Sequence, residues 1–248
     1  MRNKRSAFLK YNLILAFFET TPAMQDSRPT SLPVSLGTTI MACSYKNGIV
    51  LAADSRTTTG TYIANRVTDK LTKLHENIWC LRSGSAADTQ ALADITRRQL
   101  KSAELHNGRV TTKMAAHVMG KMAYQYRSQM SAGLIVVGLD NEDDADENKM
   151  EIDGLQYSIY AIPLGGSIHK QPFTIGGSGS TFIYGYCDAH FKHDFTKEQC
   201  VEFVKNSVSL AMHRDGSSGG CIRYCVLENN TVTRHVVLGN DLPQHIIN

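Results

Sequence analysis

Long apolar runs are missing from this 248-residue sequence, because none approaches the roughly 18 residues that a membrane-spanning helix needs. The six cysteines include no C-x-x-C pair, so the sequence offers neither a zinc ribbon nor a thioredoxin-type motif. They lie mostly in apolar stretches, which favours buried free thiols in a reducing compartment. The Gly-rich stretch 176–180 lacks the Lys of a P-loop, so we expect no nucleotide site there.

An excess of basic charge is also missing from most of the chain. The first 37 residues hold five basic and two acidic side chains, whereas the other 211 hold 21 of each sign. A neutral body without a basic cluster argues against a nucleic-acid binder. With 42% apolar residues, the chain has enough material for one substantial core, and we expect one domain.

The segment 1–37 has two interpretations. A basic start and an apolar stretch over 7–18 resemble a weak secretory signal, although Lys10 and Asn12 interrupt that stretch. The other interpretation is a poorly structured pro-segment, because residues 20–35 are rich in Ser, Thr and Pro.

Apolar periodicity places the remaining elements. Alternation predicts a hairpin of 39–45 with 49–53, turning at Asn47-Gly48. Further strands are expected at 78–83, 134–139, 157–162, 173–175, 221–227 and 231–238, and helices at 85–105, 111–130, 181–191 and 196–214. Because hairpins join most strands and the helices come in pairs, we predict an α+β fold of two packed antiparallel sheets with helix pairs outside.

Three patterns look like functional sites but have the wrong context. Residues 140–147 contain six acids in eight positions, yet they lack the EF-hand spacing, so a solvated loop is expected. The G-x-S-x-G at 216–220 follows a helix and precedes a strand, which reverses the context of a nucleophile elbow. Cys187, His190 and His193 could share a helix face around zinc, but no fourth ligand follows at a suitable spacing.

The Gly37-Thr38 junction, at the start of the first strand, suggests a different chemistry. A Thr hydroxyl is a poor nucleophile unless a base takes its proton, and one solution uses the free amine of the same residue. Thr38 would then have to become a chain terminus, so residues 1–37 would be removed. Asp54 and Lys70 lie where neighbouring strands bring them beside Thr38, although the same two side chains could form a plain ion pair.

The segments 37–42, 48–60, 62–71, 80–90, 176–180 and 214–220 resemble the proteasome beta subunits, in particular the catalytic beta-1, or caspase-like, type of the eukaryotic 20S core. The resemblance implies the four-layer α-β-β-α sandwich of N-terminal nucleophile hydrolases. It also implies a propeptide over 1–37 that is removed on maturation, a catalytic domain over 38–248, and no metal or cofactor. Residues 1–36 have no such match, and the acidic insertion at 140–153 is particular to this chain.

The family chemistry transfers to matching positions of this sequence. Thr38 would be the nucleophile with its own α-amine as base, Lys70 would supply a nearby positive charge, and Asp54 would hold that ammonium. The Gly84 backbone N–H would stabilise the oxyanion. The residues expected to support the Thr38 amine are Ser178, Asp215 and Ser218.

The resemblance also implies a substrate pocket. Arg82 would form its floor and favour substrates with Asp or Glu before the scissile bond. A carboxylate partner for Arg82 within the chain is the alternative. The positions expected to line the pocket are Thr57, Thr68 and Thr72, and those expected to grip the peptide with strand-like backbone are Thr58 and Ala86.

A threonine endopeptidase of this type would cleave after acidic residues in ATP- and ubiquitin-dependent protein degradation. Its implied partners are the other beta subunits of a seven-membered ring, the alpha rings of the 28-subunit 20S core, regulatory caps and unfolded polypeptide substrates. No nucleic acid or membrane is expected, and the implied location is cytoplasm and nucleus. A non-catalytic beta subunit and a stand-alone N-terminal nucleophile amidase remain alternatives.

Overall fold

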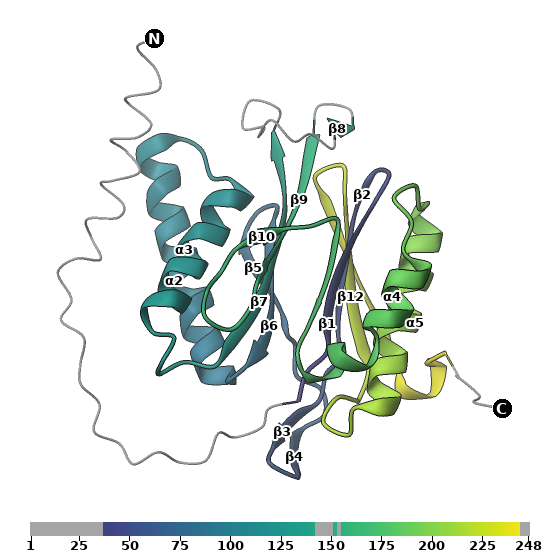
Figure 1. The fold of residues 1–248 in the computed structure, drawn as a ribbon. Coiled ribbons are helices and arrows are strands. Elements are labelled where there is room, and N and C mark those ends of the chain that lie inside the picture. The colour runs from purple at the N-terminus through teal and green to yellow at the C-terminus, as the bar shows by residue number, and fades with distance from the viewer. Residues whose placement is uncertain (1–36, 142–150, 153–154, 244–248) are drawn as a thin grey trace. The chain divides into compact units, whose positions relative to one another are not determined.

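The computed structural model describes residues 37–141, 151–152 and 155–243 (Figure 1). The predicted segment 1–36 and most of the acidic insertion at 140–153 lie outside this part. Within it, every strand pairs antiparallel with its neighbours.

The two large sheets follow the predicted architecture. The first has the order β11 (Phe173–Gly176), β1 (Ile40–Tyr45), β2 (Gly48–Ala53), β12 (Ile222–Glu228) and β13 (Thr231–Val237). The second has the order β10 (His169–Lys170), β9 (Leu155–Ile162), β7 (Ala132–Asn141), β6 (Ile78–Gly84) and β5 (Leu71–His75), with β8 (Glu151–Ile152) paired to β9. A separate two-stranded ribbon joins β3 (Thr57–Thr59) to β4 (Tyr62–Asn65).

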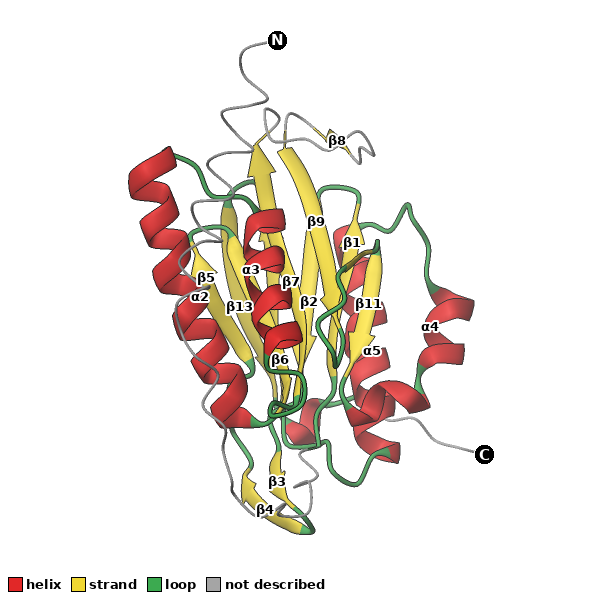
Figure 2. Cartoon of the chain, turned by 60° about the vertical axis from the view of Figure 1, so that its left-hand side comes forward, coloured by secondary structure: helices red, strands yellow, loops and turns green. Residues whose placement is uncertain are grey.

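Helices cover the outer face of each sheet (Figures 1 and 2). The second sheet carries α2 (Ala86–Asn107) and α3 (Thr112–Gln125), and the first carries α4 (Tyr184–His190) and α5 (Lys197–Arg214). Two short 3-10 turns, η2 (Ser178–Phe182) and η3 (Gly239–Asp241), complete the described elements. The predicted α-β-β-α sandwich is therefore confirmed.

The sequence of the β1–β2 hairpin explains why it lies at the centre of the molecule. Ile40 and Ala42 alternate with Met41, Cys43 and Tyr45, and all five are buried. The first set packs between the sheets and the second packs beneath α4 and α5. A strand with apolar residues on both faces is stable only when both faces are covered, as the helix layer and the second sheet do here.

The turn of that hairpin differs from the prediction. The two loop residues are Lys46 and Asn47, while Gly48 already pairs with Tyr45 in the ladder. Gly48 is needed for space rather than for a type I′ turn, because a Cβ there would lie 2.2 Å from the Leu227 carbonyl oxygen. In the β12–β13 hairpin, by contrast, Asn229 and Asn230 have φ values of 48° and 57°, which are the left-handed angles that a type I′ turn requires.

The helices α2 and α5 begin where the sequence predicted, each behind a capping side chain. Ser85 caps α2 by accepting from the Asp88 N–H, as expected, and Thr196 forms a capping box with Gln199 at α5. The side of α2 that faces away from the sheet includes the exposed residues Ala87 and Ala91. The buried side chains of this helix are Thr89, Leu92, Ala93, Thr96, Leu100 and Ala103.

Other expectations need correction in detail. The helix predicted over 181–191 is divided at Ile183 into η2 and α4. Asp140, expected in a solvated loop, is buried at the end of β7 and accepts hydrogen bonds from the Thr112 N–H and hydroxyl. The strands β3, β4, β5, β8 and β10 were not predicted.

The six cysteines are buried free thiols, as predicted. Among the described residues, no helix combines the length and the apolar character that crossing a membrane would require.

Candidate active site

The hairpin geometry brings the first predicted residues together. Because β1 and β2 are antiparallel, the residues that precede β1 and follow β2 meet at the same end of the first sheet. The Asp54 N–H donates to the Thr39 carbonyl there, at 3.1 Å. Lys70 comes from the other sheet, directly before β5, and reaches the same point.

Asp54 is a fully buried carboxylate with four donors. Its Oδ1 accepts from Lys70 Nζ at 2.7 Å and from the Thr39 N–H at 2.9 Å. Its Oδ2 accepts from the N–H groups of Arg56 at 3.1 Å and Gly219 at 3.0 Å. Asp54 is thereby held rigidly, and it fixes the position of the Lys70 ammonium.

Lys70 is the central cation of the site. Besides Asp54, its Nζ donates to Thr38 Oγ1 at 2.9 Å and to the Gly37 carbonyl oxygen at 3.2 Å. Burial lowers the pKa of Lys70 from its usual value of 10.5, and this effect outweighs the opposing attraction of Asp54 and Asp215. The nearby charge of Arg82 lowers that pKa further. A proton-accepting form of Lys70 is therefore easier to reach than in a solvated lysine.

The nucleophile predicted from the sequence lies against the bond predicted to break. Thr38 Oγ1 donates to the Gly37 carbonyl oxygen at 2.6 Å, and the Gly37 N–H donates to Thr58 Oγ1 at 3.1 Å. Only Gly fits before Thr38, because a Cβ on residue 37 would lie 2.4 Å from the backbone carbonyl atoms of Ser217.

A chain of hydroxyls leads away from the Thr38 nitrogen. The Thr38 N–H donates to Ser178 Oγ at 3.1 Å, and the Ser178 hydroxyl donates to Asp215 Oδ2 at 2.6 Å. The Ser218 hydroxyl donates to the same oxygen, also at 2.6 Å. The three residues expected to support the amine are thus brought together around it, from η2 and from the loop that follows α5.

Gly84 ends β6 in a conformation that favours glycine. Its φ is 95°, and a Cβ there would lie 2.2 Å from the Ser131 carbonyl oxygen. A close approach of main chain at this point explains the residue type, and the role of its N–H toward an oxyanion stays a prediction.

Arg82 is 9% exposed and lies beside Lys70, because its N–H donates to the Lys70 carbonyl at 3.1 Å. Its guanidinium donates to three neutral oxygens: Thr72 Oγ1 at 2.8 Å, Thr89 Oγ1 at 3.3 Å and the Asp69 carbonyl at 3.0 Å. None of the ion pairs between described residues includes it. Within the described part of the chain, the carboxylate partner considered from the sequence is absent.

The other predicted pocket residues surround this region. Thr57 and Thr68 share a hydrogen bond of 2.8 Å between their hydroxyls, and Thr72 supports Arg82. Thr58 lies in the short strand β3 as expected. Ala86, however, is the exposed first residue of α2 rather than part of a strand, because Ser85 caps the helix directly before it.

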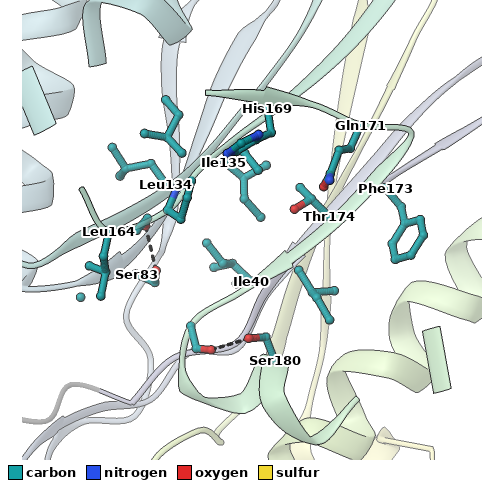
Figure 3. A pocket seen from close by; sticks show the side chains of 18 of the residues that line it. Ile40, Ser83, Leu134, Ile135, Leu164, His169, Gln171, Phe173, Thr174 and Ser180 are labelled. Carbon is teal, nitrogen blue, oxygen red and sulfur yellow. Dashed lines mark hydrogen bonds between the residues drawn. The ribbon is translucent and has the colours of Figure 1, made fainter. Parts of the chain in front are cut away.

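A cavity of about 850 Å³ adjoins the residues around Thr38 (Figure 3). Gly84 and Ser178 both line it, and Figure 3 shows the apolar side chains of Ile40, Leu134 and Ile135 around it. The cavity therefore lies next to Gly84 and Ser178, the residues predicted to serve the oxyanion and the Thr38 amine.

Four contributors were missed from the sequence. Thr39 links Asp54 to Ser218, Arg56 donates to the Gly216 carbonyl at 2.9 Å, Thr89 holds Arg82, and Ser217 crowds Gly37. The Thr-Thr pair at 38–39 was the one visible signal. The described residues contain no group of three or more His, Cys, Asp and Glu side chains able to hold a metal ion.

The comparisons with known proteins agree with this geometry. Residues 34–227 match the family described as "Proteasome subunit". The chain is 51% identical to proteasome subunit beta type-6 of Dictyostelium discoideum over 215 residues, which cover 85% of this chain and 94% of the relative. It is 52% identical to proteasome subunit beta type-1 of Saccharomyces cerevisiae over 211 residues (85% and 93%).

A further relative is human proteasome subunit beta type-9, which is 43% identical over 220 residues, covering 87% of this chain and 93% of the relative. A layered sandwich with a Thr, Asp and Lys cluster at one end of its sheets defines an N-terminal nucleophile type of architecture. The chain belongs to the proteasome beta-type subunit family, whose members assemble with other subunits into the 20S core.

Proposed function

We propose that this protein is a catalytic threonine endopeptidase subunit of the 20S core, of the beta-1 type, which cleaves preferentially after acidic residues. One observation carries the proposal: Lys70 Nζ contacts both Thr38 Oγ1 and the Gly37 carbonyl oxygen while Asp54 holds it from behind. A base, a nucleophile and the carbonyl to be attacked therefore lie within hydrogen-bond distance of one another.

The same geometry accounts for removal of residues 1–37 by Thr38 itself. Before cleavage the Thr38 nitrogen is an amide and cannot serve as a base, so neutral Lys70 takes the hydroxyl proton. Thr38 Oγ1 bonds to the Gly37 carbonyl carbon, the carbon–nitrogen bond breaks, and the nitrogen takes a proton. This step frees the Thr38 amine and leaves the Gly37 acyl group as an ester on Thr38 Oγ1. Water then hydrolyses that ester, which frees the Gly37 carboxylate and the Thr38 hydroxyl. While protonated, Lys70 stabilises the negative charge that develops on the Gly37 oxygen.

After cleavage the new amine takes over as base toward peptide substrates. An α-amine has an ordinary pKa of about 7.7–8, so a substantial fraction is neutral near pH 7. Thr38 Oγ1 attacks the substrate carbonyl, the leaving amine departs, and water clears the acyl-enzyme. Lys70 provides a fixed positive charge beside the hydroxyl, and the Gly84 N–H serves the oxyanion.

The surroundings of Arg82 support the acidic preference. A buried guanidinium whose known acceptors are all neutral oxygens keeps a full positive charge in a region of reduced dielectric. Three of its five N–H groups are used by these oxygens, which leaves two for an incoming carboxylate. A substrate Asp or Glu would supply the missing counter-charge.

In this role the subunit works inside a seven-membered beta ring stacked on alpha rings, with regulatory caps delivering unfolded polypeptides in ATP- and ubiquitin-dependent degradation in cytoplasm and nucleus. A non-catalytic beta subunit is the main alternative, and a stand-alone amidase is the other. A native mass of several hundred kilodaltons is expected, whereas a monomeric mass would favour the amidase.

The test of the activity compares assembled particles that carry wild-type chain or Thr38→Ala. Fluorogenic peptides that end in Asp or Glu should be hydrolysed by the first and not by the second, while peptides ending in Leu or Arg report the other subunits. Equal hydrolysis of acidic peptides by both particles would assign that activity elsewhere and leave this chain non-catalytic.

A further inference from the structure

Thr39 is the fully buried neighbour of the nucleophile, and three separate segments meet at it. Its hydroxyl lies 2.8 Å from Ser218 Oγ, and its N–H donates to Asp54 Oδ1 at 2.9 Å. The 3-10 turn η2 presses against the same hydroxyl, because a Cβ on its residue Gly179 would lie 2.0 Å from Thr39 Oγ1. A polar side chain enclosed this completely has its hydrogen-bond geometry fixed by its surroundings.

Counting protons sets the direction of every bond in the chain of hydroxyls. Asp215 Oδ2 is a carboxylate oxygen, so the hydroxyls of Ser178 and Ser218 each spend their single proton on it. Ser218 Oγ therefore has only lone pairs to offer Thr39, and Thr39 must be the donor in that contact. At the other end, Ser178 Oγ accepts from the Thr38 N–H.

We propose that Thr39 is a positioning residue for the Thr38 amine, acting through Ser218, Asp215 and Ser178. This inference rests on the proposed function, since only a cleaved chain has an amine. Because Ser178 accepts an N–H hydrogen of the amine, the nitrogen lone pair is left to face the Thr38 hydroxyl. The donor from Thr39 satisfies Ser218 and strengthens its bond to Asp215, which limits how strongly Asp215 polarises Ser178 toward the amine.

Loss of the Thr39 hydroxyl should therefore favour the protonated amine. Ser218 would become a weaker donor, Asp215 would draw more strongly on Ser178, and Ser178 would hold an ammonium N–H more tightly. The other charged groups facing the amine are Lys70, Asp54 and, behind Lys70, Arg82. Their contacts do not involve the Thr39 hydroxyl, and the Thr39 N–H bond to Asp54 uses backbone, so a side-chain substitution changes the hydroxyl chain alone.

The experiment uses assembled 20S particles carrying Thr39→Val, Thr39→Ser or Thr96→Val. Thr96 is the matched control, because it is a fully buried Thr in α2 whose hydroxyl donates to the Leu92 carbonyl at 2.8 Å, in a different layer. Hydrolysis of an acidic-ended peptide is measured from pH 5 to pH 9, and the N-terminus of the chain is determined by mass spectrometry. A Thr38→Ala particle gives the background.

For Thr39→Val we expect kcat at neutral pH to fall on the order of tenfold. KM should stay within about twofold, and the acid limb of the kcat profile should move to higher pH. Leader removal, which does not use a free amine, should still occur. Thr39→Ser keeps a hydroxyl and should have the wild-type pH profile of kcat. Thr96→Val should have the wild-type profile as well.

An unshifted acid limb in Thr39→Val overturns the proposal, as does an equal loss in Thr96→Val. A leader that stays attached to Thr39→Val overturns it as well, because the hydroxyl would then act in chain cleavage. If Thr39→Val does not assemble, Thr39→Ala removes the same hydroxyl without adding bulk and is judged by the same shift. Failure of the proposed function looks different, since wild type and Thr38→Ala would then hydrolyse the peptide equally.

Discussion

Lys70, directly before β5, and Arg82, in the neighbouring strand β6, are two buried cations whose partners differ. Lys70 is paired with a carboxylate, Asp54, at 2.7 Å, whereas the acceptors of Arg82 among the described residues are neutral oxygens. A buried charge is costly unless it is paired, so a compensated cation can serve as permanent machinery while an uncompensated one favours an incoming anion. In the proposed function, this difference assigns Lys70 to the nucleophile and Arg82 to the substrate.

The largest effect is expected from removing Lys70, the cation that is paired with a carboxylate. Lys70→Ala should lower both leader removal and acidic peptide hydrolysis by about 10²–10⁴-fold, which is the range for loss of an acid–base group. Ring assembly should be largely retained. Lys73→Ala, at an exposed lysine in β5, the strand that follows Lys70, is the control and should behave as wild type. Wild-type turnover in Lys70→Ala would reduce Lys70 to a structural ion pair.

Removing the charge of Asp54, the carboxylate paired with Lys70, should have the next largest effect. Asp54→Asn leaves Lys70 without its anion and gives the three backbone donors a weaker acceptor, so leader removal should slow on the order of a hundredfold. Because Asp54 raises the pKa of Lys70, its loss should also move the acid limb of leader removal to lower pH. The limb is followed by mass spectrometry of precursor particles incubated at different pH values.

Asp94→Asn, which removes an exposed carboxylate paired with Arg97, is the matched control for that substitution. An acid limb that moves to higher pH in Asp54→Asn would contradict the assigned role of Asp54.

Removing Arg82, the cation without a carboxylate partner among the described residues, should change substrate specificity rather than the turnover of all substrates. Arg82→Met should cost acidic-ended substrates about 1.5–3 kcal/mol, or roughly ten- to over a hundredfold in kcat/KM, while leader removal persists. The measurement uses fluorogenic peptides that differ only in the residue before the scissile bond. Arg98→Met, at an exposed arginine of α2, should leave the acidic preference intact. An unchanged preference in Arg82→Met would refute the caspase-like assignment.

The smallest predicted effect is a shift in the pH dependence of leader removal, opposite in direction to the shift expected for Asp54→Asn. Arg82 lowers the pKa of Lys70, so Arg82→Met should raise it and move the acid limb of leader removal to slightly higher pH. Opposite shifts in the two variants would sharpen the distinction between the two cations. Shifts in the same direction would mean that something other than these two charges controls Lys70.

The sequence was sufficient to predict the layered fold and the clustering of Thr38, Asp54 and Lys70. Apolar alternation with paired helices predicted the two sheets, and the Gly37-Thr38 junction with Asp54 and Lys70 predicted the cluster. Short elements such as β3 and β4 were missed, because strands of three and four residues are too short to carry a periodic signal. The turn at Lys46-Asn47 was misplaced since Gly48 is required by the neighbouring strand β12, which local sequence does not reveal.

Long-range contacts account for what could not be predicted in the site. The acceptors of Arg82 could not be predicted, because Thr72, Thr89 and the Asp69 carbonyl come from three different parts of the chain. Thr39 was overlooked because its importance comes from a contact with Ser218, 179 residues away. Only the folded chain brings such side chains together.

The most direct test of the central claim is the N-terminus of this chain in purified particles, measured by intact mass for wild type and Thr38→Ala. We expect the wild-type chain to begin at Thr38 and the variant to keep residues preceding it, because Lys70 and the Thr38 hydroxyl together break the Gly37 bond. A Thr38→Ala chain that also begins at residue 38, or a wild-type chain that keeps its leader, would contradict the account.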